Sequence, residues 1–113
     1  MLGMNAARAY QARSADRNLR EQEADVFRRA TAALRQAQSG EQIDQVRAVA
    51  DNSMLWTTLV IMLKDPQNAL PKALRGSLIS VGLTVQREMA AEQPDFGFLI
   101  GINEQITAGL TGA

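Results

Sequence analysis

The sequence predicts an all-α protein: a compact bundle of four main helices with a short N-terminal helical arm. Ala, Leu, Gln, Arg and Glu are abundant among the 113 residues, and all five favour helices. Aromatic residues make up only 4% of the chain and prolines number three, so the signals for strands are weak. Apolar residues recur at the spacing of amphipathic helices. We therefore expect one helical domain over residues 16–113, with residues 1–15 as an arm.

The first main helix is expected to begin at Asp16, a good N-cap residue, and to end at Ser39-Gly40. Its apolar positions are Leu19, Val26, Phe27, Ala30, Leu34 and Ala37. The preceding arm has little apolar surface to bury, so we expect it to be frayed or to be ordered by a partner.

A second helix is expected from Glu41, with an apolar stripe at Ile43, Val46 and Ala50. The polar segment 51–53 has poor helix propensity and predicts a kink or a break. Residues 54–63 are apolar nearly all round, which is typical of a central helix packed on several sides. This segment contains Trp56, the only tryptophan, which we expect in the core more readily than as a binding anchor.

Two more helices follow a proline-rich loop at residues 65–71. Pro71 suits the first turn of the third helix, and Asp95 suits the cap of the last. The apolar stripe of the third helix is Leu74, Leu78, Val81, Val85 and Met89, and that of the last is Leu99, Ile102, Ile106 and Leu110. Gly76 and Gly82 predict close helix approach, and Gly109 and Gly112 are stop signals.

Three polar groups need partners if they are buried. The indole N–H of Trp56 is expected to find Asn52 or Asn68. Asn103 lies beside an apolar stripe and suits a structural role or a partner's backbone equally well. Arg75 lies in the first turns of a helix, where the dipole disfavours a cation, so we expect Asp65 or the carboxyl end of a neighbouring helix to offset that cost.

The composition argues against an enzyme. The chain has no cysteine and no histidine, so it offers neither a disulfide nor thiolate or imidazole ligands for a metal, and we expect no cofactor. A Ser-His-Asp or Cys-His site is excluded for the same reason. Lys64, Lys72 and Tyr10 lie in no recognisable catalytic motif.

Net charge is zero but unevenly distributed: residues 1–35 hold seven basic and four acidic residues, and residues 36–113 hold five and eight. Arg8, Arg13, Arg17 and Arg20 are candidate basic contacts for RNA or an acidic partner, although such a helix is more often simply solvated. The charge density is far below that of nucleic-acid-binding arms, so we do not expect direct nucleic-acid binding. No apolar run is long enough to span a bilayer, and we expect a cytoplasmic protein.

Three blocks of residues carry a family resemblance. They are Asn52-x-x-Leu55-Trp56, then Pro66-x-Asn68-Ala69-Leu70-Pro71-x-x-Leu74-Arg75, then Ile102-Asn103-x-x-Ile106-x-x-Gly109-Leu110. Together with Met4-Asn5-Ala6, Tyr10 and the Glu23, Phe27, Thr31, Leu34 series, they resemble the bacterial FlaF family of flagellar biosynthesis regulators. One departure is Ser53, where the family often has a basic residue.

The resemblance implies a cytoplasmic helical protein that binds flagellin and supports its synthesis and export. Flagellin's terminal helices bury their apolar faces only in the filament, and a helical partner with an open groove can cover them before export. The alternative implied by the resemblance is a regulator of flagellin mRNA translation that acts with FlbT. The residues matched to the family blocks are expected to bind the partner or to define the fold; the sequence does not indicate which apolar stripe stays uncovered.

Overall fold

The computed structural model describes residues 21–112, and every regular element in that range is a helix. Residues 21–38 form the described part of the first helix. It is followed by α2 (Gln42–Lys64), α3 (Lys72–Met89) and α4 (Phe96–Thr111). The predicted all-α bundle of four main helices is confirmed. The expected arm, the Asp16 cap and Leu19 lie outside the described residues.

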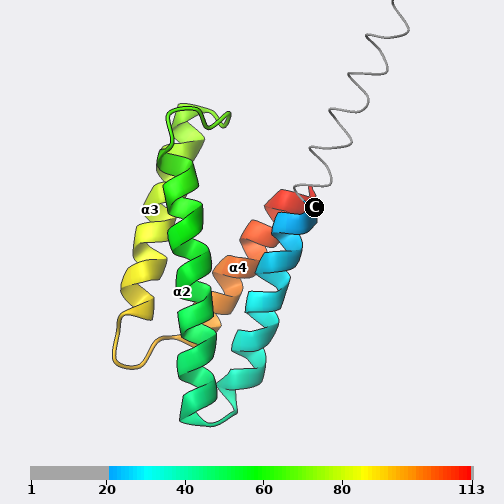
Figure 1. Ribbon diagram of the computed structural model, residues 1–113, viewed down its shortest axis with the longest axis vertical. Coiled ribbons are helices and arrows are strands. Elements are labelled where there is room, and N and C mark those ends of the chain that lie inside the picture. Colours follow the sequence, from blue (N-terminus) through cyan, green and yellow to red (C-terminus); the bar gives the residue numbers. More distant parts are fainter. Residues whose placement is uncertain (1–20, 113) are drawn as a thin grey trace, which may run out of the picture.

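The helices surround a core to which all four contribute. In Figure 1, α2 and α3 form an antiparallel hairpin, and the first helix and α4 lie on the other side of α2. The core contains Phe27, Leu34, Ala37, Ala48, Trp56, Val85, Met89, Leu99 and Ile100. Phe27 meets Trp56 edge to face, with the ring centroids 5.8 Å apart. An ion pair between Arg35 and Glu104 also joins the first helix to α4.

Gly82 lets α3 approach α2 closely, as its place inside a helix predicted. A Cβ atom there would lie 2.5 Å from Cγ2 of Val60, which is closer than two carbon atoms can pack. Gly76 has no such role, because a Cβ at that position would meet nothing within 4 Å. The prediction of close approach is therefore confirmed for Gly82 and wrong for Gly76.

The helix ends follow the local sequence signals. The Asp95 side chain caps α4 by accepting a hydrogen bond from the backbone N–H of Phe98 at 3.1 Å. Gly112 ends α4 with a φ of 75°, a conformation that suits glycine. Gly109 lies inside α4, so it is not a stop. Pro71 is the N-cap of α3, directly before its first turn.

The expected break at residues 51–53 is wrong, because α2 runs without interruption through the segment. Helix propensity is low there because the polar side chains can compete with the helix for backbone hydrogen bonds. Asn52 is buried and its amide binds other helices instead, so it does not compete with its own backbone. Tertiary partners thus override a local preference.

Burial differs from the sequence expectation on α2 and on the first helix. Residues 54–63 are not packed on several sides, because Met54, Ile61 and Met62 are exposed. Ile43 and Val46 are exposed too, and Ala48 and Asn52 face the core in their place. On the first helix Val26 is exposed. None of the helices in the described part of the chain is both long and apolar enough to cross a membrane.

Candidate functional site

Three of the family-matched residues form a buried polar network inside the bundle. Trp56 Nε1 donates to Asn103 Oδ1 at 2.9 Å, and Asn103 Nδ2 donates to Asn52 Oδ1 at 2.7 Å. Asn52 Nδ2 in turn faces Met89 Sδ at 3.2 Å. Trp56, Asn52 and Asn103 are each fully buried, and their contacts join α2, α3 and α4. These side chains act within the fold.

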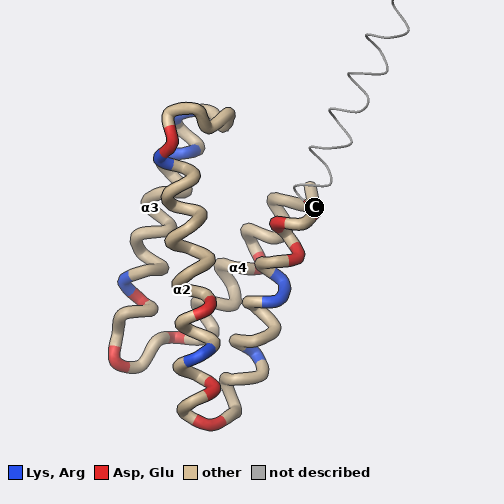
Figure 2. The backbone as a smooth tube through the Cα atoms, viewed as in Figure 1, with Lys and Arg blue, Asp and Glu red and all other residues tan. Residues whose placement is uncertain are grey.

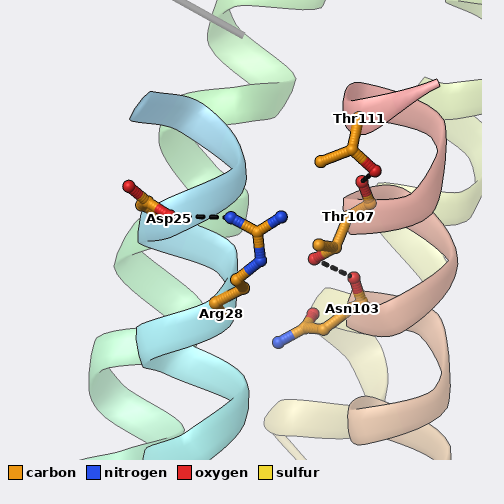
Figure 3. A network of polar contacts seen from close by, with 5 residues as sticks. All are labelled: Asp25, Arg28, Asn103, Thr107 and Thr111. Carbon is orange, nitrogen blue, oxygen red and sulfur yellow. Dashed lines mark hydrogen bonds and ion pairs between the residues drawn. The ribbon is translucent and has the colours of Figure 1, made fainter. Parts of the chain in front are cut away.

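The network corrects the expected partner of Trp56 and places the side chain of Asn103 inside the fold. Trp56 is a core residue, as expected, but its partner is neither Asn52 nor Asn68: it is Asn103, 47 positions further along the chain. Asn103 faces the interior of the protein. Figure 3 shows its backbone oxygen accepting a hydrogen bond from Thr107, one turn further along α4, opposite the exposed Arg28–Asp25 ion pair.

A second group of family-matched residues holds the α2–α3 loop. Asn68 Nδ2 donates to the backbone oxygen of Met62 at 3.0 Å, and Asn68 Oδ1 accepts from the backbone N–H of Leu70 at 3.0 Å. Arg75 Nη1 donates to the backbone oxygen of Asp65, the C-cap of α2, at 3.0 Å. The carboxyl end of α2 is thus the partner of Arg75, and the Asp65 carboxylate is not.

The other family-matched residues divide between core and surface. Leu55, Ile102, Ile106 and Leu110 are partly buried and pack against the core. Leu70 and Leu74 are exposed at the loop end of the hairpin. Pro71 is exposed as well, at the start of α3. Arg8, Arg13, Arg17 and Arg20 lie outside the described residues. Most of the residues quoted from the three blocks are therefore buried or partly buried.

The surface feature that stands out is an apolar stripe on the outer face of α2. We call it the α2 stripe; its members are Ile43, Val46, Ala50, Met54 and Ile61. Its four large side chains are 53–73% exposed. At 100° per residue these positions lie opposite the buried face of α2, which carries Ala48, Asn52, Trp56, Val60 and Leu63. The helix is thus apolar on two faces, and the described fold covers one of them.

Charged residues border the α2 stripe on the side that faces the first helix. A groove of about 370 Å³ there is lined by Ala33, Gln36, Ala37, Asp44, Arg47, Ala48 and Asp51. Neither carboxylate in the groove forms an ion pair with another described residue. Figure 2 shows these charges on the first half of α2, followed by an uncharged second half that ends at Lys64 and Asp65.

No group of three or more acidic, cysteine or histidine side chains in residues 21–112 is placed to hold a metal ion. A smaller cleft of about 310 Å³ between the first helix and α4 is lined by Arg28, Thr31, Ala32, Arg35, Glu104, Thr107 and Ala108. The α2 stripe combines the most exposed large apolar side chains of the described chain. It is the candidate site.

Residues 21–112 thus form an all-helical bundle in which one face of α2 is apolar and exposed. The chain belongs to the flagellar protein FlaF family, whose model matches residues 6–110. No curated protein and no solved structure matches the chain.

Proposed function

We propose that this protein is a flagellin-binding regulator and export chaperone that supports flagellin synthesis and secretion during flagellum assembly. The observation that carries the proposal is the α2 stripe, an apolar helix face exposed to solvent in a member of a flagellar family. Exposed apolar faces of this extent commonly mark sites for other proteins. Flagellin's own terminal helices need such a cover before they assemble into a filament.

The α2 stripe supports a reversible complex. Full burial of a large apolar side chain contributes about 1.5–3 kcal/mol, so covering the exposed parts of Ile43, Val46, Met54 and Ile61 contributes about 4–7 kcal/mol in total. Association costs at least about 4 kcal/mol in lost translational and rotational freedom. The stripe therefore supplies only part of the binding free energy of a stable complex, and the exposed Leu70 and Leu74 provide further apolar surface. Release then proceeds by competition at the export gate, without ATP.

The experiment is size-exclusion chromatography with light scattering on this protein mixed with monomeric flagellin from the same organism. We expect a stoichiometric complex at both low and moderate salt, because apolar burial depends little on ionic strength. If no complex forms at low salt and none forms at moderate salt, the proposal is contradicted. The alternative function, control of flagellin mRNA translation with FlbT, then becomes the working hypothesis.

That alternative has its own signature. Direct RNA binding should weaken steeply with salt and should be lost when Arg8, Arg13, Arg17 and Arg20 are replaced by glutamine. A pull-down of FlbT with the same variant separates a direct RNA contact from one made through FlbT. Unchanged flagellin levels in cells carrying the variant contradict a role for these arginines.

A further inference from the structure

The length and the line of the α2 stripe indicate the shape of what covers it. Its members, Ile43, Val46, Ala50, Met54 and Ile61, recur at steps of three, four and seven residues along one side of the helix, a line that we call the seam. Such steps place side chains where two packed helices meet. The seam spans 19 residues of unbroken helix, about 27 Å at 1.5 Å per residue. A helix of about five turns, lying along α2, matches that length.

A second copy of this chain fits the seam poorly. Antiparallel self-pairing centred on Asn52 would place Ile43 against Ile61 and Ala50 against Met54. This pairing brings Asp51 beside its counterpart in the second copy, where like charges repel. The residues thus favour a different helix over self-pairing.

The charges beside the seam favour a basic edge on that helix. Asp44 and Asp51 are two turns apart on α2, about 10 Å along the axis, and both line the groove toward the first helix. Two carboxylates against the one guanidinium of Arg47 leave this edge with a net charge of −1. A lysine or arginine of a bound helix that reaches Asp44 or Asp51 from the side of the stripe would gain a charge-assisted contact.

We propose that the α2 stripe binds one amphipathic helix of a partner protein, about five turns long, whose lysine or arginine side chains reach Asp44 or Asp51 from the side of the stripe. The apolar edge of that helix covers Met54 and Ile61. The identification of that helix as part of flagellin rests on the proposed function. The length and the charge expected of the helix follow from the site alone.

Two synthetic peptides test the chemistry without flagellin. Both have 21 residues and leucine at the seam positions, and they differ only in lysine or glutamate at the flanking positions. Fluorescence anisotropy with the full chain should show the lysine peptide binding about tenfold more tightly than the glutamate peptide. The double variant Asp44→Asn, Asp51→Asn should remove this preference. Equal binding of the two peptides, or binding of neither, overturns the proposal.

A pair of matched variants tests the location. Met54→Glu places a charge in the stripe, and Leu83→Glu places one on α3 at an exposed apolar position outside the stripe. Both should keep the wild-type melting temperature, because neither side chain is buried. Met54→Glu should bind the lysine peptide at least about tenfold more weakly, and Leu83→Glu should bind like wild type. Equal loss in both variants, or loss in neither, contradicts the assigned location.

The two proposals fail in different ways. If the peptides bind with the expected preference but wild-type protein does not bind flagellin, the site stands and the proposed function is wrong. If flagellin binds wild type and Met54→Glu equally, the proposed function stands and the site is wrong. A concentration-dependent dimer in light scattering that Met54→Glu abolishes assigns the stripe to self-pairing and overturns the inference.

Discussion

Replacing Asn103 by alanine should destabilise the protein more than any other single polar substitution on α4. The change removes the acceptor of the Trp56 indole N–H and the donor to Asn52 Oδ1, both in a fully buried setting. A buried polar group left without a partner costs about 1–3 kcal/mol. Two such groups and a small cavity together predict a loss of about 3–6 kcal/mol in the free energy of unfolding.

That loss is a large share of the stability of a chain of this size, which is about 5–15 kcal/mol. Urea unfolding followed by circular dichroism and by the fluorescence of Trp56 measures it. The control is Gln105→Ala, an exposed position on the same helix, which should change the stability by less than about 0.5 kcal/mol. A loss below about 1 kcal/mol for Asn103→Ala would refute the reasoning, because water would then have to satisfy the orphaned groups.

Four further substitutions test the packing and the helix ends, each by its midpoint in urea or its melting temperature. Gly82→Ala should cost at least about 1–3 kcal/mol because its Cβ would overlap Val60, and a wild-type midpoint would contradict the close approach. Gly76→Ala should stabilise by about 0.4–1 kcal/mol because nothing obstructs it and helical alanine is favoured over glycine; a loss would contradict the open space. Trp56→Ala should cost about 3–5 kcal/mol, and a variant that lost flagellin binding at wild-type stability would instead make Trp56 a contact residue. Asp95→Ala should cost about 1 kcal/mol through loss of the cap on α4, and no change would show that the bond to Phe98 contributes nothing.

Local signals in the sequence predicted most of the fold. The cap at Asp95, the glycine at Gly112 and the end of the first helix at Ser39-Gly40 depend on residues within a turn of one another, and all three are confirmed. The core position of Trp56 follows from its apolar neighbours, and burial confirms it. These features are decided by short-range chemistry that can be derived from a single sequence.

The long-range partners could not be predicted in the same way. Asn52 and Asn103 are 51 positions apart, and nothing local indicates that their amides meet. Propensity therefore predicted an interruption of α2, whereas tertiary contacts sustain the helix. For Arg75, by contrast, one of the two expected partners is confirmed: it donates to a backbone oxygen at the carboxyl end of α2 and not to the carboxylate of Asp65.

The candidate site was not predicted from the sequence. Ile43, Val46 and Ala50 were recognised only as the apolar stripe of the second helix, and the structure leaves that stripe exposed and continues it to Met54 and Ile61. The sequence makes α2 apolar on two faces, and hydropathy alone does not tell which of them the other helices cover. The covered face is the one that carries Asn52 and Trp56, whose polar groups pair with Asn103.

The central claim is that the α2 stripe is the surface that binds flagellin. Titration calorimetry of monomeric flagellin into wild-type protein and into Met54→Glu tests it most directly, with Leu83→Glu as the matched control. The account predicts at least about tenfold weaker binding for Met54→Glu, wild-type binding for Leu83→Glu and a negative heat-capacity change on binding. Equal affinity of wild type and Met54→Glu for flagellin would contradict the account.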